Sequence, residues 1–481
     1  MRREVRTGVT DTVAGAILQD MLAEWLPRQR WFPGRGSAAS ELAIVSDVPL
    51  LAGDPQLRHL VIEVEQAGGP ARFQVLVGSS SEPPTAIGNP VSGDPVIGTL
   101  PGLVVYDALH DPELAAVLLR WIAEQRLAGP LRFVREPTAP TADVPAEGRL
   151  LGAEQSNTSL VFGDAAILKV LRRLFPGANP DLEVADALAR LGSDRVAAPF
   201  GWIETELDGE PVLLAVLSEF LAGAREGWSL ALESLSRLYA RLGSYGHEYL
   251  TTPMPANGGW PEAGAGLPFG AEARELGVAT AQMHADMAAA FGHRDMMPAE
   301  LGALAAALTS KLDAAVAVVP QLGPHADRIT AAYADLAALT EPVRVQRIHG
   351  DYHLGQVMKS RRGWVALDFE GEPAVPLAER RALAPALRDV AGMLRSLDYA
   401  ARHQLIGHPH AQELVSAADS WARQCQDAFC AGYAAASGAD PRDHATLLRA
   451  LTLDKAVYEV IYEYRHRPTW LSIPLDYVAT S

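Results

Sequence analysis

The sequence predicts an α+β fold in which a small β-containing part and a β-rich part precede a large helical part. The chain has 481 residues, too many for one compact core, so we expect two or more substructures. Strand-like runs dominate before about residue 225 and helical patterns dominate after it. These changes of pattern place the expected boundaries at 1–95, 96–221 and 222–481.

Charge and cysteine content exclude several classes of protein. The net charge of −17 argues against non-specific binding to nucleic acid or to an anionic membrane. We find no apolar run long enough to span a bilayer, and the N-terminus lacks the apolar segment of a signal peptide. Cys425 and Cys430 are spaced for neither a disulfide nor a zinc site. We therefore expect a soluble cytoplasmic protein with buried, reduced cysteines.

The N-terminal part is expected to start with a helix and continue as strands. A short helix over 14–26 leads into the basic and aromatic turn PRQRWFPGRG. Apolar runs bounded by turn residues predict strands at 41–51, 58–66 and 71–79. Residues 79–102 are rich in Ser, Gly and Pro and are expected to form a boundary.

The next part is expected to combine strands with a few helices. The pattern PELAAVLLRWIAEQRL predicts a helix at 112–127, and the loop 137–148 follows it. Residues 148–174 predict three strands joined by turns. A helix at 179–192, opened by an Asn-Pro pair, precedes a buried strand at 211–220.

From about residue 225 the chain is expected to be mostly helical. The strongest helical patterns cover 275–291 and 328–340. A glycine- and proline-rich insert at 255–270 interrupts them, and we assign it no role.

The polar turn Gln155–Ser159 lies between two strand patterns. Ser156, Asn157 and Thr158 offer small polar side chains and backbone N–H groups that can hold phosphate oxygens. The turn lacks a GxGxxG pattern, and an ordinary polar hairpin is the alternative.

Lys169 is one of only four lysines in the chain and lies within the apolar strand AILKVL. Burial of a lone ammonium is costly, so a partner is expected, and Glu183 in the following helix is the natural one. The alternative is a lysine at the strand edge that extends to water. Glu219, at the end of the buried strand pattern, is grouped with these nucleotide-binding candidates.

The segment HGDYHLGQ follows a strand pattern and concentrates hydrogen-bonding groups in one loop. Asp351 is expected to accept the proton of a substrate hydroxyl, as the catalytic-loop aspartate of kinases does. Gln356 lies five residues later, where kinases carry a metal-binding asparagine, and its amide oxygen can bind a hard cation. His349 is expected to brace the loop, and His353 either does the same or touches substrate.

The segment WVALDFEGEP carries the expected metal carboxylates. Asp368 ends an apolar strand, and Glu370 is close enough to reach the same Mg²⁺ or a second one. A surface β-turn is the alternative. In the helix pattern LRDVAGMLRSLDYAA, Asp389 is expected to hydrogen-bond the backbone of the HGDYHLGQ loop. These parts, in this order, predict a bilobal protein-kinase-like fold with ATP and Mg²⁺ as cofactors.

The C-terminal helix pattern LDKAVYEVIYEYRHRPTW mixes aromatic and charged residues. Asp454 and Tyr458 share one face, while Lys455 and Glu459 share the neighbouring one. Such a mixture is typical of carbohydrate sites, where rings pack on the sugar and charged groups bind its hydroxyls. A solvated helix with Lys–Glu pairs is the alternative.

Four segments together resemble bacterial maltokinase: HGDYHLGQV, DFEGEPAVPLAERR, LRDVAGMLRSLDYAA and LDKAVYEVIYEYRHRPTWLSIP. The segments WLPRQRWFPGRG and GAEQSNTSLVFGD extend the resemblance over almost the whole chain. HGDxxxx[NQ] alone marks the wider aminoglycoside-phosphotransferase-like kinases, whereas the C-terminal helix and DFEGEP are more specific.

The resemblance implies ATP-dependent phosphorylation of maltose at the anomeric hydroxyl, which feeds α-1,4-glucan synthesis. It also implies an N-terminal cap, and it matches Asp351 to the base, Gln356 and Asp368 to the metal ligands and Lys169 to the phosphate-binding lysine. Sugar contacts are expected from the C-terminal helix residues above, with Arg395 as a further candidate. Association with a trehalose–maltose isomerase is implied by the family alone.

Two rival functions remain open at this stage. The first is a kinase of another small substrate, such as glucosamine, an aminoglycoside or choline. A site for a cation should be more acidic, and Lys455 and Arg465 argue against it. The second is a pseudokinase that binds nucleotide as a partner module, but Lys169, Asp351 and Asp368 are all present.

Overall fold

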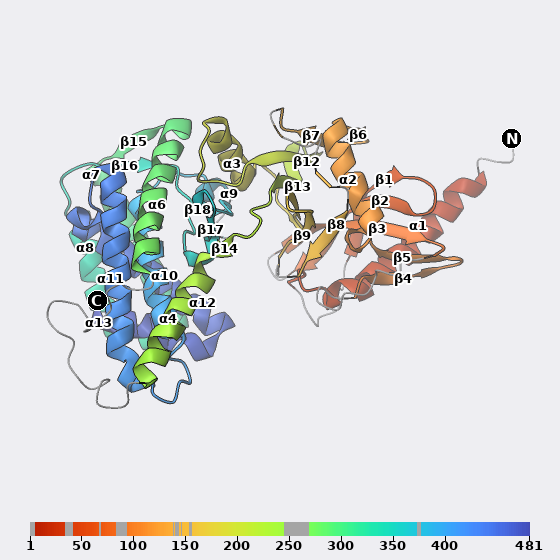
Figure 1. The fold of residues 1–481 in the computed structure, drawn as a ribbon. Helices are drawn as coiled ribbons and strands as arrows, with labels where there is room; N and C mark the ends of the chain where they lie inside the picture. The colour runs from red at the N-terminus through yellow and green to blue at the C-terminus, as the bar shows by residue number, and fades with distance from the viewer. Residues whose placement is uncertain are drawn as a thin grey trace. The chain divides into compact units, whose positions relative to one another are not determined.

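The chain forms two compact units in this computed structural model, drawn in Figure 1. The N-terminal unit comprises Met1–Glu183 and Ala197–Ala222, and the C-terminal unit comprises Val184–Val196 and Gly223–Ser481. The structure describes residues 5–33, 42–66, 69–82, 94–137, 139, 144–145, 147–152, 156–244, 269–372 and 377–481. Gln155 and nearly all of the 255–270 insert lie outside these ranges.

The first sheet of the N-terminal unit is antiparallel and has the strand order β1-β2-β3-β5-β4, with β11 added to β3. Its strands are β1 (Leu42–Leu51), β2 (Gln56–Gln66), β3 (Gly69–Ser80), β4 (Val96–Leu100), β5 (Leu103–Asp107) and β11 (Arg173–Leu174). Helix α1 (Val5–Trp25) packs on it through Leu22 and Trp25, and the turn η1 (Leu26–Arg28) follows the helix. This helix is longer than expected, and β4 and β5 extend the sheet beyond residue 95.

The second sheet of this unit has the order β6-β7-β12-β13-β10-β9-β8, and all of its pairs are antiparallel. Its strands are β6 (Leu127–Ala128), β7 (Leu131–Arg135), β8 (Gly148–Leu151), β9 (Thr158–Phe162), β10 (Ala166–Val170), β12 (Pro199–Leu207) and β13 (Glu210–Glu219). Helix α2 (Pro112–Glu124), preceded by the turn η2 (Ala108–His110), packs on it through Leu118 and Ile122. Helix α3 (Pro180–Arg190) begins in this unit and continues into the next.

The C-terminal unit is mainly helical, as the sequence predicts. Its longer helices are α4 (Gly227–Ser244), α6 (Gly270–Phe291), α7 (Pro298–Val318), α8 (Ala326–Ala337), α10 (Leu387–His403), α11 (Ala411–Ser437) and α12 (Ala445–His466). Helices α6 and α11 lie side by side (Figure 1). Gly277 and Gly432 allow this close approach, because a Cβ atom at either position would clash with the backbone of the facing helix.

Short strands and turns of the C-terminal unit carry the expected catalytic loop. Two small sheets pair β14 (Arg225–Glu226) with β17 (Val357–Ser360) and β18 (Gly363–Ala366), and β15 (His293–Met296) with β16 (Val343–Gln346). The remaining elements are η4 (Pro320–His325), η5 (Leu354–Gln356), α9 (Leu377–Arg380), η6 (Pro441–His444), η7 (Pro468–Trp470) and α13 (Ser472–Thr480). The catalytic loop therefore connects β16 to η5 and β17.

Helix α7 contradicts the expectation that no apolar run of the chain is long enough to span a bilayer. Among the described residues it is the one helix long and apolar enough, by length and composition, to cross a membrane. Its residues Leu301, Leu308 and Leu312 are buried in the core of the C-terminal unit, so one face of the helix packs against that core. Both cysteines are buried and free, and burial raises the pKa of each thiol, so neither is a reactive thiolate.

Candidate active site

Asp389 braces the catalytic loop from below, as the sequence predicts. Its carboxylate accepts hydrogen bonds from the backbone N–H groups of His349 (2.8 Å) and Gly350 (2.9 Å). His284 of α6 lies 3.0 Å from the same carboxylate. Asp389 is 1% exposed, and hydrogen bonds to a buried carboxylate are strong, so the backbone of this loop is fixed before any ligand binds.

His349 also braces the loop. Its Nε2 lies 2.8 Å from the carbonyl oxygen of Leu367, which precedes Asp368, so the imidazole ties the catalytic loop to the segment expected to bind metal. The ring packs against Tyr352 and Phe369 and is almost fully buried. The sequence-based interpretation of His349 as a structural residue is therefore correct.

Asp351 lies in an ion-pair cluster with Lys455 and Glu372. The Nζ atom of Lys455 is 2.9 Å from Asp351 Oδ1 and 3.0 Å from Glu372 Oε1. Burial would raise the pKa of Asp351, but the ammonium of Lys455, with smaller contributions from His353 and His349, outweighs it and holds the pKa below its ordinary value. Burial would lower the pKa of Lys455, but the two carboxylates hold that pKa above its ordinary value. Asp351 and Lys455 are therefore both charged at neutral pH.

His353 lies beside this cluster. Its Nε2 is 3.9 Å from Asp351 Oδ2, and its Nδ1 accepts a hydrogen bond from the backbone N–H of Gly355 at 3.0 Å. Burial, with the neighbouring ammonium of Lys455, lowers the pKa of His353. The imidazole is therefore neutral, caps the turn η5 and faces the same space as Asp351.

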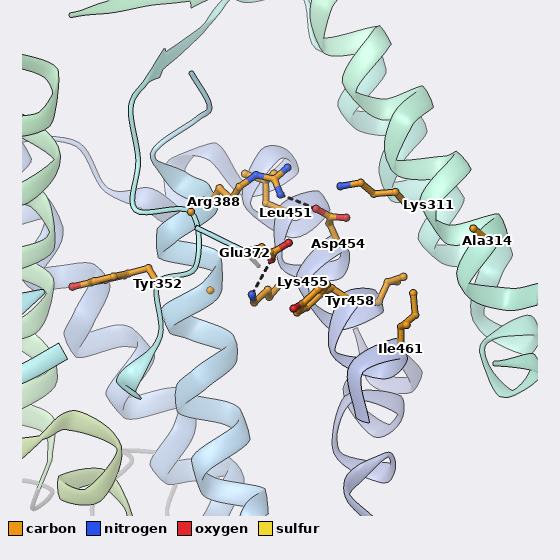
Figure 2. Close-up of a pocket in the computed structure, with 13 residues that line it drawn as sticks. Lys311, Ala314, Tyr352, Glu372, Arg388, Leu451, Asp454, Lys455, Tyr458 and Ile461 are labelled. Atoms are coloured by element: carbon orange, nitrogen blue, oxygen red, sulfur yellow. Dashed lines mark hydrogen bonds and ion pairs between the residues drawn. The ribbon is translucent and has the colours of Figure 1, made fainter. Parts of the chain in front are cut away.

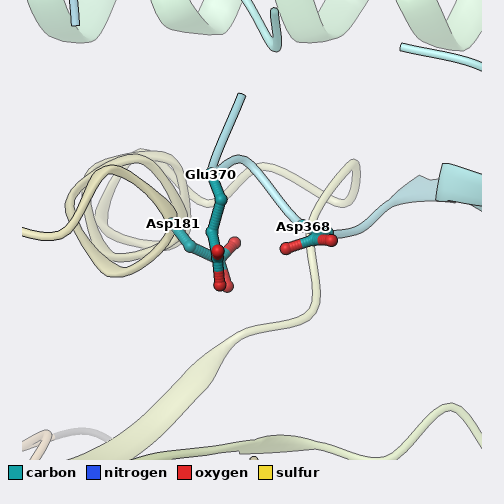
Figure 3. A group of neighbouring side chains, drawn as sticks. All are labelled: Asp181, Asp368 and Glu370. Atoms are coloured by element: carbon teal, nitrogen blue, oxygen red, sulfur yellow. The ribbon is translucent and has the colours of Figure 1, made fainter. Parts of the chain in front are cut away.

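Gln356, Asp368 and Glu370 gather hard oxygen ligands near the catalytic loop. The amide of Gln356 donates to Asp368 Oδ2 at 3.3 Å, and the backbone N–H of Leu367 donates to the Gln356 carbonyl at 2.9 Å. Oxygens of Asp368 and Glu370 lie within 4.8 Å of each other on one loop (Figure 3, where Asp181 belongs to the N-terminal unit). Rotation of the Gln356 amide would present its oxygen instead, so these residues fit Mg²⁺.

A cavity of about 390 Å³ opens directly above Asp351. It lies wholly within the C-terminal unit, and its size is that of a small-molecule site. Its lining combines aromatic rings with charged groups: Trp228, Asp351, His353, Gly355, Gly392, Ser396, Tyr399, Lys455, Tyr458, Glu459, Tyr462, Glu463, Arg467 and Trp470. We call it the acceptor cavity.

Helix α12 supplies much of the acceptor cavity, and its charges are turned inward. Lys455 pairs with Asp351 rather than with Glu459 of its own helix. Glu459 instead accepts hydrogen bonds from Arg395 at 2.6 and 3.1 Å. Glu463 is bound by Arg467 of the following turn at 2.8 Å. The alternative of a solvated helix with Lys–Glu pairs is therefore wrong.

Arg395 does not line the acceptor cavity. It is fully buried behind Glu459, donates to Asp398 at 2.8 Å and packs against the ring of Tyr477. Its expected role as a sugar contact becomes one of holding Glu459 in place. Burial raises the pKa of Glu459, although Arg395 opposes this, so the carboxyl depends on the guanidinium to stay ionised.

A second cavity of about 260 Å³ adjoins the acceptor cavity, since Lys455 and Tyr458 line both. Figure 2 shows Asp454 in its wall between Arg388 and Lys311. Asp454 pairs with Arg388 at 3.0 Å, so it belongs to this second cavity rather than to the acceptor cavity.

The expected nucleotide-binding lysine lies in the centre of the second sheet of the N-terminal unit. Lys169 of β10 is flanked by Ser159 of β9 and Val216 of β13. Its Nζ lies 3.6 Å from Asp181 of α3, two residues before the expected partner Glu183. The functional pairing of Lys169 with Glu183 stays a prediction.

Other nucleotide-binding candidates lie on the same sheet. Ser156 is exposed and Asn157 is half-buried, as phosphate-binding groups would be, whereas the Thr158 hydroxyl accepts a hydrogen bond from Arg172 at 2.8 Å. The hydroxyl of Thr158 is therefore already engaged. Glu219 ends β13, and its backbone N–H donates to the carbonyl oxygen of Ala198 at 2.9 Å.

Sequence reasoning missed several residues of the site, and Glu372 and Trp228 are two examples. Glu372 is part of the DFEGEP segment, yet only the three-dimensional approach of α12 shows that it binds Lys455. Trp228 begins α4, far from the motifs in sequence, and no pattern around it indicated a place in the acceptor cavity.

Comparisons with known proteins agree with this geometry. Residues 25–111 match a family model described as the maltokinase N-terminal cap domain. The chain is 32% identical over 353 residues to a glucosamine kinase of Streptacidiphilus jiangxiensis, covering 71% of this chain and 75% of the relative. It is 27% identical over 332 residues to a glucosamine kinase of Mycolicibacterium smegmatis, covering 68% and 77%. A solved glucosamine kinase in complex with glucosamine, ADP and inorganic phosphate superposes with a TM-score of 0.63 at 26% identity, covering 96% and 98%.

The fold, the catalytic loop and the acceptor cavity define a small-molecule kinase with an N-terminal cap and a helical C-terminal unit. Such an enzyme transfers a phosphoryl group from ATP to a hydroxyl of its acceptor. The chain belongs to the family of maltokinase-like sugar kinases that includes these glucosamine kinases.

Proposed function

We propose that this sugar kinase phosphorylates maltose at its anomeric hydroxyl, with ATP as donor, to give maltose 1-phosphate and ADP. The observation that carries the proposal is the ammonium of Lys455 beside Asp351 in the acceptor cavity. An ammonium at this point donates hydrogen bonds to the hydroxyls of a neutral sugar.

The pairing of the other charges supports a neutral acceptor. Glu459 is bound by Arg395, and Glu463 is bound by Arg467. A cationic substrate would have to compete with a guanidinium for each of these carboxylates. A neutral sugar needs only hydrogen-bond donors and acceptors, which the same groups offer at their edges.

Aromatic rings support a carbohydrate in particular. Tyr458 and Tyr462 are stacked one helical turn apart, with ring centroids 6.3 Å apart and planes 25° apart. Trp228 and Trp470 add large rings to the lining. Flat aromatic surfaces bury the C–H face of a sugar ring, while polar groups at the margin bind its hydroxyls.

In the proposed mechanism Asp351 orients the anomeric hydroxyl and accepts its proton as the oxygen attacks the γ-phosphorus. Lys169, with Ser156 and Asn157, holds the phosphates of ATP. Gln356, Asp368 and Glu370 are the residues that would hold Mg²⁺, which when bound offsets charge on the phosphates. Arg395 and Asp389 act indirectly, by holding Glu459 and the catalytic loop.

Glucosamine is the second candidate acceptor, because the named relatives are glucosamine kinases. A panel of maltose, glucosamine, glucose and kanamycin with ATP separates the two functions, with ADP release and product identification as readouts. Preference for maltose with a phosphate on the anomeric carbon supports the proposal. Preference for glucosamine refutes it in favour of the second candidate.

Asp351→Asn tests the catalytic assignment for either sugar. The amide keeps the shape of the carboxylate but cannot accept the proton, so we expect turnover to fall by about 10²- to 10⁴-fold. ATP affinity, measured by calorimetric titration, should change little. Turnover close to that of the unsubstituted enzyme would remove Asp351 from the mechanism.

We also propose a cytoplasmic location, where ATP is supplied, and a role in α-1,4-glucan synthesis, both on the strength of the maltokinase resemblance. Association with a trehalose–maltose isomerase is proposed on the same ground. Co-purification of the two enzymes in stoichiometric amounts is the measurement that supports it.

A further inference from the structure

The carboxylate of Asp351, which is expected to act as base, already forms an ion pair in the acceptor cavity. Lys455 donates to Asp351 at 2.9 Å and to Glu372 at 3.0 Å, and its ammonium lies 4.7 Å from the centre of the Tyr458 ring. The three charged side chains are only 15–19% exposed. A water molecule that entered the cavity would meet an Asp351 whose Oδ1 already accepts a charged hydrogen bond.

We propose that Lys455 is a specificity-determining residue that blocks Asp351 until the sugar binds, and so suppresses transfer of the phosphoryl group to water. The proposal rests on the role of Asp351 given above. It goes beyond that role because it assigns to Lys455 and Glu372 a function in the absence of sugar.

The side reaction that has to be suppressed is simple. Water attacks the γ-phosphorus of ATP, a new P–O bond forms, and the bond to the β–γ bridging oxygen breaks. ADP leaves with the electron pair, and the proton of the attacking water passes to Asp351 and then to solvent. Water is smaller than any sugar and cannot be excluded by the shape of an open cavity, so discrimination has to come from the state of the base.

Lys455 provides that discrimination in two ways. Its hydrogen bond occupies the Asp351 oxygen that would otherwise orient an attacking hydroxyl. Its charge also makes the carboxylate a poorer proton acceptor, because protonation of Asp351 would leave a buried ammonium with one partner fewer. Single water molecules can also accept from Lys455 but are not held in place, whereas a bound sugar presents several hydroxyls in fixed positions within the same cavity.

Glu372 makes the release of Asp351 possible. When Lys455 turns to the hydroxyls of a bound sugar, the second carboxylate keeps the ammonium paired, so no isolated charge is left buried. Space for the movement exists, because Lys455 lines both cavities, of about 390 and 260 Å³. A lysine suits this task, since its flexible stem carries a single charge that can change partners.

The test measures two rates on each variant: ADP release without sugar, and sugar phosphate formed with sugar. Lys455→Met removes the block, so ADP release without sugar should rise about tenfold, the effect of one charged hydrogen bond on a barrier. Sugar phosphorylation should fall, because the hydroxyls lose a donor. Lys359→Met is the matched control, since Lys359 forms an ion pair with Glu275 outside the cavity, and both rates should stay within about twofold.

A second variant is expected to change ADP release without sugar in the opposite direction, which protects the test against misfolding of the first variant. In Glu372→Gln the ammonium loses its alternative carboxylate and binds Asp351 more firmly. ADP release without sugar should then drop below that of the unsubstituted enzyme, and the KM for sugar should rise more than kcat falls. A protein with a merely damaged fold would lose both rates in both variants.

The outcomes separate this proposal from the proposed function. The double variant Asp351→Asn, Lys455→Met should lose the extra ADP release, because the freed base is gone. If Lys455→Met leaves ADP release unchanged or lowers it while Asp351→Asn abolishes sugar phosphorylation, the block is refuted and the base assignment stands. If Asp351→Asn keeps full sugar phosphorylation, the proposed mechanism itself fails.

Discussion

Replacement of Arg395 by methionine gives the sharpest test of how the acceptor cavity is supported. The guanidinium is fully buried and donates to Glu459 at 2.6 and 3.1 Å and to Asp398 at 2.8 Å. Methionine fills similar space without a charge. Asp398 keeps a second partner, because Arg402 lies 3.2 Å from it, so Glu459 is the carboxylate that loses its cation.

The size of the effect follows from this loss. Removal of one partner from a buried ion pair costs about 3–5 kcal/mol, because the other charge is left without compensation. Burial already raises the pKa of Glu459, and loss of Arg395 raises it further. A carboxyl whose pKa is higher in the folded than in the unfolded state destabilises the protein increasingly as pH rises. The difference from the unsubstituted enzyme should therefore be larger at pH 8 than at pH 5.

Urea unfolding followed by tryptophan fluorescence at these two pH values measures the effect. Arg294→Met is the matched control, because Arg294 pairs with Glu300 on the surface, with both side chains more than two-fifths exposed at 49% and 42%. Its cost should stay below about 1 kcal/mol. If Arg395→Met costs no more than this control at pH 8, the guanidinium does not support Glu459 as described.

Three further predictions follow from the same structure. Gly432→Ala should destabilise the protein by about 1–3 kcal/mol, because its Cβ would meet the backbone of α6. Gly302→Ala has open space around it and should instead gain up to about 1 kcal/mol of helix propensity. Thermal unfolding of the two variants measures both effects. Asp389→Ala should lower kcat at least about tenfold with an unchanged acceptor preference, because the backbone of the catalytic loop loses the hydrogen bonds that hold it. Steady-state kinetics with the sugar panel measure both quantities. An unchanged kcat in the folded variant would mean that Asp389 contributes to stability alone. Lys455→Met should move the acid limb of the pH–rate profile upward, because burial then raises the pKa of Asp351 without an opposing ammonium, and a limb that stays in place would contradict this cause.

Much of the fold could be predicted from the sequence, because it rests on patterns local to each element. The apolar run of β2 and the helical pattern of α6 are such patterns, and both elements formed where expected. The length of α1 and the pairing of β11 with β3 could not be predicted, since a two-residue strand is defined by its partner rather than by its own residues. Helix α7 passed the length and hydropathy test of a membrane span because its apolar residues are not confined to the buried face.

In the candidate site, too, local patterns could be interpreted from the sequence, whereas contacts between distant elements could not. The expected roles of Asp351, Gln356 and Asp368 could be proposed from the sequence because they depend on short spacings within one segment, and these roles stay predictions. Arg395 and Glu372 were misassigned or missed because their roles depend on which helix packs behind them. The sequence placed both among sugar- or metal-binding motifs, but the structure gives each of them a charged partner instead of a direct place beside the substrate.

Helix α12 has a consequence for how this family can diversify. Residues 455, 458, 459, 462 and 463 of this one helix line the acceptor cavity, whereas the phosphate chemistry is assigned to a separate loop and sheet. Mutations on a rigid helix alter the recognised sugar without disturbing the reacting groups, so acceptor preference can drift while phosphoryl transfer stays under selection. Lys455 is an exception on this surface, because it touches both the cavity and Asp351. On the role proposed for Lys455, its replacement would change the sugar contact and the control of ATP hydrolysis in the same step.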